Sequence, residues 1–96
     1  MQANQVLKVV VLSWRPPLAV PEGRTVANYF VYRVDGASVT PSTFAKKNFV
    51  GSTVSPTTTL NDTKVTGGKT YTWWVIAQFD NGDRTSISNF VTKTVQ

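Results

Sequence analysis

The fold is decided by the stretch Gly68-Lys69-Thr70-Tyr71-Thr72-Trp73-Trp74-Val75-Ile76-Ala77-Gln78-Phe79-Asp80. Successive side chains of a β-strand point to opposite faces, so every second residue shares a face. Both alternating sets are apolar here: one contains Tyr71, Trp73, Val75 and Ala77, and the other contains Trp74 and Ile76. A run that is apolar on both faces is typical of a strand inside a sheet. We therefore predict that residues 68–80 form the central strand of a β-sandwich.

The length and composition of the chain limit the class of protein to which it can belong. The 96 residues suffice for one hydrophobic core, so we predict a single domain over residues 1–96. Short runs rich in valine, threonine and aromatic residues alternate with glycine and proline, which favours strands over helices. No run approaches the ~20 apolar residues of a membrane span, and no charged segment followed by an apolar one stands at the N-terminus. We therefore predict no membrane insertion. No window of useful length has apolar residues at helical spacing, so we also predict no helix longer than one turn.

The residues that most often carry chemistry are scarce. The sequence contains no cysteine and no histidine, which excludes disulfides, thiolate metal sites and the commonest general base. Asp35, Asp80 and Asp83 fall in predicted turns, where aspartate bonds nearby backbone, and we expect the same of Asp62. Calcium binding by Asp80, Asn81 and Asp83 is the alternative, but their spacing lacks the pattern of a calcium loop. We predict no enzymatic activity, no metal site and no cofactor.

The net charge of +5 comes from 10 basic and five acidic residues that are scattered along the chain. Among the basic residues only Lys46 and Lys47 are adjacent. Nucleic-acid-binding domains usually gather basic residues on one face or along one helix. We interpret the charge as a source of solubility and of weak attraction to anionic surfaces, and we predict no specific nucleic-acid site.

Turn signals divide the rest of the chain into further strands. The predicted strands are Val6–Trp14, Val26–Val34, Lys46–Thr53, Pro56–Asp62 and Arg84–Val95. The predicted connections include an irregular excursion at Ala37–Ala45, a crossing between sheets at Thr63–Gly68 and an Asn-Gly hairpin turn at Asp80–Asp83. About seven short antiparallel strands in this order predict an all-β, immunoglobulin-like sandwich with Greek-key connections.

Four segments resemble parts of fibronectin type III domains. Val10–Pro17 resembles the second strand with its core tryptophan, Tyr29–Gly36 is similar to the third strand, Thr59–Val75 resembles the segment with the tyrosine corner, and Asp80–Asn89 resembles the last turn and strand. The resemblance covers residues 6–95 and is greatest to modules of bacterial secreted and phage tail proteins. It implies a first strand of its own, for which Met1–Gln5 are too few, so we expect that strand to be short or missing.

The predicted core residues occupy inward-facing positions of these strands, except Val65, which enters the core from the crossing between sheets. They are Trp14, Tyr29, Val65, Tyr71, Trp73 and Val75. Tyr71 stands where the chain enters the central strand after crossing between sheets, where backbone groups lack ladder partners. We expect its hydroxyl to bond a backbone carbonyl near Val65 while its ring stays in the core, as the tyrosine corner of the resemblance also implies.

A second apolar set lies on the opposite face of the central strand and its neighbour. Phe30, Tyr32, Trp74 and Ile76 are predicted to share the outer face of one sheet as a possible interaction face. Such a face often marks a contact with another protein or domain, which is the first interpretation. In the second interpretation the excursion Ala37–Ala45 covers the face, with Phe44 lying over it.

A platform for sugar rings is the third interpretation of this face. Trp74 and Tyr32 would then stack on sugar rings. Asn28, Gln78 and Arg33 would be the polar neighbours that bond sugar hydroxyls. Exposed aromatic rings are the feature on which this interpretation depends.

The resemblance implies a non-catalytic module of a larger extracellular protein, either secreted or on a cell or virion surface. It would act as a spacer or as a protein-interaction domain, and its partners would be neighbouring domains or other proteins. The alternative is a carbohydrate-binding module that binds polysaccharide through the outer aromatic residues. The order of the strands is expected to place the two ends of the chain at opposite poles, as suits a bead in a string of modules.

Overall fold

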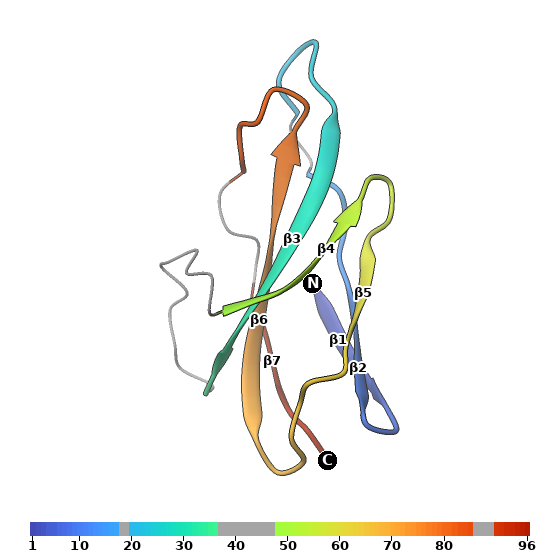
Figure 1. Ribbon diagram of the computed structural model, residues 1–96, viewed down its shortest axis with the longest axis vertical. Coiled ribbons are helices and arrows are strands. Elements are labelled where there is room, and N and C mark those ends of the chain that lie inside the picture. The colour runs from blue at the N-terminus through green and yellow to red at the C-terminus, as the bar shows by residue number, and fades with distance from the viewer. Residues whose placement is uncertain (18–19, 37–47, 86–89) are drawn as a thin grey trace.

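The computed structural model describes residues 1–17, 20–36, 48–85 and 90–96 (Figure 1). These residues form seven strands and no α-helix. The strands are β1 (Gln2–Val6), β2 (Val9–Ser13), β3 (Val26–Asp35), β4 (Phe49–Val54), β5 (Thr59–Asp62), β6 (Thr70–Phe79) and β7 (Val91–Thr94). A search of these residues for a helix of the length and apolar character that a bilayer requires finds none.

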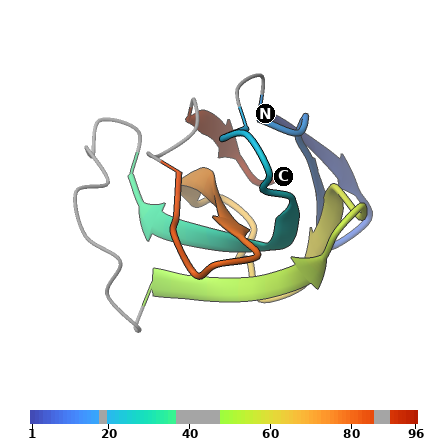
Figure 2. The same ribbon diagram turned by 90° about the horizontal axis from the view of Figure 1, so that it is seen from above.

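The strands form two antiparallel sheets that face each other (Figure 2). The order is β1-β2-β5 in the three-stranded sheet and β4-β3-β6-β7 in the four-stranded sheet. Consecutive strands pair in β1–β2, β3–β4 and β6–β7, and the chain crosses to the other sheet after β2, β4 and β5. This confirms the predicted all-β, immunoglobulin-like sandwich with Greek-key connections.

β6 is the interior strand that the sequence predicts. It lies between β3 and β7, and its pairing with β3 runs from Val26 opposite Phe79 to Asp35 opposite Tyr71. Residues 71–77 are all buried, because both faces of the strand are covered. The double apolar alternation of this stretch therefore corresponds to two separate packing layers.

The inner faces of the sheets enclose the main core. Its buried members are Val10, Leu12, Trp14, Tyr29, Val31, Tyr71, Trp73, Val75, Ala77 and Val95. Val65 is half-buried and packs against this cluster from the segment that crosses between β5 and β6. All six predicted core residues thus lie in this cluster or against it.

The N-terminal segment differs from the prediction. One strand was expected over Val6–Trp14, but the chain forms a hairpin in which Gln5 lies opposite Val10. The turn falls at Leu7, whose φ of 56° is unusual for a residue with a side chain. Met1 and Ala3 alternate with exposed residues and pack against the core, so a first strand of five residues is present.

The strand ends also differ in places. β4 begins at Phe49, β5 at Thr59 and β7 at Val91, each later than predicted. Arg84 forms a single bridge with Gln78 beyond the end of the hairpin turn. The predicted excursion Ala37–Ala45 lies outside the described residues.

The two ends of the chain do not lie at opposite poles. The Gln5 side chain accepts a hydrogen bond from the amide of Gln96 at 2.8 Å and donates one to its carbonyl at 3.3 Å. Figure 1 shows the C-terminus near one end of the long axis and the N-terminus about midway along it. The expectation of opposite poles is therefore wrong, because the short β1 runs back toward the end where β7 finishes.

Candidate functional site

The predicted interaction face is largely buried within the chain. Tyr32 lies opposite Trp74, Phe30 lies opposite Ile76, and the rings of Tyr32 and Trp74 stack with centroids 5.6 Å apart. Trp74 and Ile76 are 0% exposed and Tyr32 is 5% exposed. Of the three interpretations of this face, the platform of Trp74 and Tyr32 for sugar rings depends on exposed rings, and this burial does not fit it.

The polar residues that were predicted to lie beside this face are found on both sides of the sheet. Asn28 and Gln78 lie opposite each other and follow the outer alternation. Arg33 follows the inner alternation, and its guanidinium lies over the ring of Tyr71 in the core. Phe44, the residue expected to cover the face, lies outside the described residues.

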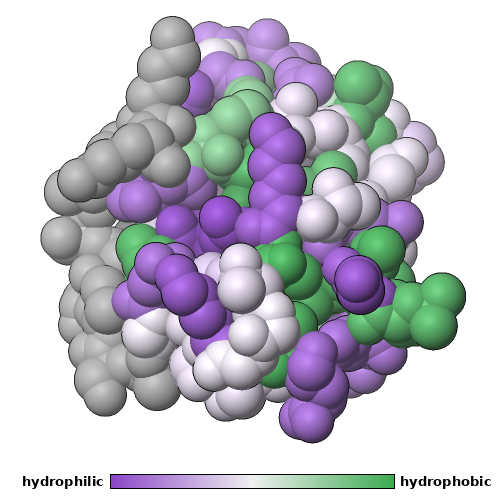
Figure 3. Space-filling view, turned by 60° about the horizontal axis from the view of Figure 1, so that its bottom comes forward, coloured by the Kyte–Doolittle hydropathy of each residue, from purple (hydrophilic) through white to green (hydrophobic). Residues whose placement is uncertain are grey.

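An exposed aromatic surface remains at the edge of this face. Phe49 on β4 is 44% exposed, and its ring lies 5.7 Å from Tyr32 and 6.4 Å from Phe30 between centroids. The guanidinium of Arg84 lies 4.9 Å from the ring of half-buried Phe30. We call Phe30, Phe49 and Arg84 the edge patch. On the face in Figure 3, apolar residues form separate patches rather than one continuous surface.

Asp62 is a buried acid, although its place in the sequence predicts only a turn residue. Its Oδ1 accepts the amide of Lys64 at 3.0 Å, which is the expected local bond of a turn aspartate. Its Oδ2 also accepts from Nη1 of Arg33 at 2.8 Å and from Nε1 of Trp73 at 3.0 Å. Asp62 thus joins β5 to β3 and β6 across the sandwich, which its position in the sequence does not signal.

The tyrosine corner is present with a different partner. The hydroxyl of Tyr71 accepts a hydrogen bond from the amide of Thr66 at 3.0 Å. A bond to a carbonyl near Val65 was expected, so that part of the prediction is wrong. The amide of Thr66 lies in the crossing segment, outside any ladder, and the phenol oxygen satisfies it. The ring stays buried, as expected.

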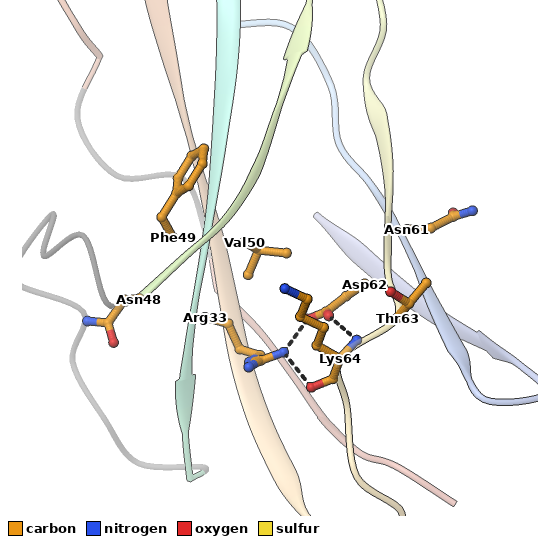
Figure 4. A pocket seen from close by; sticks show the side chains of 8 residues that line it. All are labelled: Arg33, Asn48, Phe49, Val50, Asn61, Asp62, Thr63 and Lys64. Atoms are coloured by element: carbon orange, nitrogen blue, oxygen red, sulfur yellow. Dashed lines mark hydrogen bonds and ion pairs between the residues drawn. The ribbon is translucent and has the colours of Figure 1, made fainter.

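A small pocket lies between the edges of the two sheets. Its volume is about 120 Å³, and it is lined by Arg33 and residues 48–50 from one sheet and by residues 61–64 from the other. In Figure 4 the side chains of Val50, Arg33, Asp62 and Lys64 converge, whereas the ring of Phe49 points away from them. The Arg33 guanidinium also donates to the carbonyl of Lys64 at 3.1 Å.

The acids near the hairpin turn bond other groups of the chain. Asn81 and Asp83 bond each other across the turn at 2.9 and 3.1 Å, which supports the turn interpretation over calcium binding. Asp80 lies 3.8 Å from Arg24 in an exposed ion pair. Among the described residues no group of three histidine, cysteine, aspartate or glutamate side chains is placed to hold a metal ion.

Comparison with known proteins identifies the fold. No family model and no curated protein matches the sequence. The solved pectate lyase PelI of Erwinia chrysanthemi, in complex with tetragalacturonic acid, is 24% identical with a TM-score of 0.66, and the match covers 96% of this chain and 27% of that chain. The twitchin kinase region of C. elegans (Fn31-NL-kin-CRD-Ig26) is 23% identical with a TM-score of 0.64, and the match covers 95% of this chain and 15% of that chain. This chain therefore spans less than a third of either protein.

Proposed function

We propose that the chain is a non-catalytic module of the fibronectin type III kind within a larger extracellular or virion-surface protein. The observation that carries this proposal is the unequal coverage of the structural matches. Nearly the whole chain, 96% and 95%, aligns with only 27% and 15% of two longer proteins. A sandwich that aligns with a small part of longer chains supports a role as a spacer or protein-interaction domain.

Three features support the fibronectin type III assignment within the wider sandwich class. The strand order is β1-β2-β5 in one sheet and β4-β3-β6-β7 in the other. Trp14 is buried at the end of β2, and its ring lies 5.5 Å from that of Tyr29 between centroids. The hydroxyl of Tyr71 closes the crossing between sheets, as in a tyrosine corner.

The edge patch is the surface that suits a protein contact. An aromatic ring exposed beside a guanidinium is a combination that interfaces favour. Phe49 offers this ring, and Arg84 provides the cation over the adjacent Phe30. The buried Trp74 and Ile76 act beneath the patch as support and not as contact residues.

The test compares the chain alone with the longer protein that contains it. We expect cooperative unfolding of the isolated chain, with a midpoint that rises in the longer protein if a neighbour packs on the edge patch. Phe49→Ala should abolish that rise, whereas Val54→Ala, which also removes an exposed side chain of β4, should not. An isolated chain that fails to unfold cooperatively would contradict the module proposal.

Polysaccharide binding is a second candidate function, and the polar pocket beside Asp62 is the observation that favours it. The charged side chains of Arg33, Asp62 and Lys64 converge between the edges of the two sheets (Figure 4). The similar pectate lyase is described in complex with an acidic tetrasaccharide. Titration with soluble polysaccharides, followed by tryptophan fluorescence, tests this candidate, and the absence of any saturable change would contradict it.

A further inference from the structure

The pocket beside Asp62 is not used by the spacer or protein-contact role. Its volume of about 120 Å³ is that of about four water molecules at their liquid volume. This is room for one functional group and the atoms next to it, and not for an extended peptide. The pocket is lined from the edge strands β4 and β5 of the two sheets, so we expect a chain-like ligand to extend out of it there.

The charges around the pocket favour a ligand with a single negative charge. Arg33 and Lys64 contribute two positive charges and Asp62 contributes one negative charge, which leaves a net charge of +1. A monoanion balances this charge, whereas a dianionic phosphate would also face the carboxylate of Asp62. The chemistry therefore favours a carboxylate.

The guanidinium that would bind this carboxylate is already oriented. Both hydrogen bonds of Arg33 use Nη1, one to Asp62 and one to the carbonyl of Lys64. The other N–H groups of this guanidinium have no hydrogen-bond partner within the described residues, and the side chain is 23% exposed. Arginine N–H groups held in a fixed plane bind carboxylates well. The ammonium of Lys64 supplies the second cation at the pocket mouth.

Residues with uncharged polar side chains also contribute to the pocket. Thr63, Asn48 and Asn61 also line the pocket, but in Figure 4 the amides of Asn48 and Asn61 point away from Asp62. The hydroxyl of Thr63 can both donate and accept hydrogen bonds, as sugar hydroxyls do. A carboxylate that is attached to a hydroxylated ring matches this combination better than the side chain of an acidic peptide.

We propose that this pocket binds the carboxylate of a uronic acid residue in an acidic polysaccharide, with Arg33 and Lys64 as its cationic ligands. The proposal rests on the second candidate function and names its substrate class and its site. The sugar would then bind on the opposite side of β3 from the buried rings of Trp74 and Tyr32. Binding should weaken as salt rises, because exposed charges are screened over about 8 Å at physiological ionic strength.

The experiment is a titration of the ¹⁵N-labelled chain with tetragalacturonate, observed by heteronuclear NMR. We expect saturable shifts of the Trp73 indole N–H, which bonds Asp62, and of the Lys64 amide. Lys64→Gln should weaken binding about fivefold. This variant should fold normally, because Lys64 joins the Asp62 network through its backbone only. Lys69→Gln, at an exposed lysine outside the pocket, should leave the affinity unchanged.

Each other outcome has a distinct meaning. Shifts elsewhere, with equal affinity in Lys64→Gln, would overturn the site and leave the polysaccharide function standing. Equal binding of a neutral tetrasaccharide would overturn the carboxylate as the recognised group. Equal binding of a polyglutamate peptide would overturn the sugar class. No binding of any saccharide would overturn both this proposal and the second candidate function, but not the module assignment.

Discussion

The guanidinium of Arg33 on β3 lies 2.8 Å from the carboxylate of Asp62 on β5, so that one ion pair joins the two sheets. Asp62 is 2% exposed in this pair. The ion pair of Arg24 and Asp80 differs in both respects, with 3.8 Å between the charged atoms and side chains that are 46% and 42% exposed. Water screens the exposed pair but reaches little of the buried one, so their contributions to stability should differ strongly.

Asp62→Asn should therefore lower the free energy of unfolding by about 2–3 kcal/mol, because it removes the negative charge that faces Arg33 in the interior. Asp80→Asn serves as the matched control and should change it by less than about 0.5 kcal/mol. Urea unfolding of both variants measures the difference. Equal losses would show that the Asp62 pair contributes no more than a surface pair.

Two neighbouring tryptophans should respond differently to the same substitution. Nε1 of Trp73 donates to Asp62, whereas Nε1 of Trp74 is buried and has no partner within the described residues. Trp73→Phe should lower the free energy of unfolding by about 1–2 kcal/mol more than Trp74→Phe does. Only Trp73→Phe removes a hydrogen-bond donor from the buried carboxylate of Asp62. Both changes remove a similar volume, so each controls for cavity formation in the other. A larger loss for Trp74→Phe, by urea unfolding, would contradict the prediction.

Tyr71→Phe should lower the free energy of unfolding by about 1 kcal/mol, since it leaves the amide of Thr66 without its acceptor. The ring remains, so its packing against Trp73 is retained. Tyr29→Phe is the control at neutral pH, because no hydrogen bond of the Tyr29 hydroxyl is seen within the described residues. An unchanged denaturation midpoint for Tyr71→Phe would contradict the tyrosine corner.

Leu7→Gly should stabilise the chain by about 0.5–1 kcal/mol. Leu7 adopts a φ of 56°, which glycine accepts without steric strain. Its side chain is 89% exposed, so its removal costs almost no buried apolar surface. Lys8→Gly, at the next position, has no positive φ to relieve and should destabilise. Thermal unfolding of both variants tests the prediction, which a lower midpoint for Leu7→Gly would contradict.

Alkaline pH should destabilise the chain through Tyr29. Burial raises the pKa of the Tyr29 phenol above its usual value of 10.0, because the phenolate is poorly solvated in the core. The unfolded chain thus loses this proton first, and stability that is complete below about pH 10 falls as pH rises. Tyr29→Phe should flatten the fall in the unfolding midpoint between about pH 9 and pH 11. An identical slope in the variant would contradict this assignment.

The sequence predicts the fold best where one pattern dominates. The double alternation of residues 71–77 marks an interior strand, and β6 lies between β3 and β7 as expected. The N-terminal hairpin was missed because its turn is at Leu7, a residue type that seldom accepts a positive φ. No local signal marks such a turn, and pairing of Gln5 with Val10 is decided by the core that Met1 and Ala3 join.

The candidate site was less predictable than the fold. Alternation places Trp74 and Ile76 on an outer face, but it does not show whether other parts of the chain cover that face. From the sequence, Asp62 is predicted to be a turn residue, because only its bond to the nearby amide of Lys64 can be expected from adjacent positions. Its bonds to Arg33 and Trp73 join residues that are 29 and 11 positions away, and only the three-dimensional arrangement brings them together.

The pairing of β3 with β6 also bears on how the chain reaches its native state. Val31 and Val75 lie side by side although more than forty residues separate them, so the largest ladder requires closure of a long loop. Chains dominated by such distant contacts fold in milliseconds to seconds, slower than helical bundles. Until β6 is synthesised and pairs with β3, the backbone edge of β3 is unpaired and can contact other nascent chains. Aggregation can therefore compete with folding before this pairing forms.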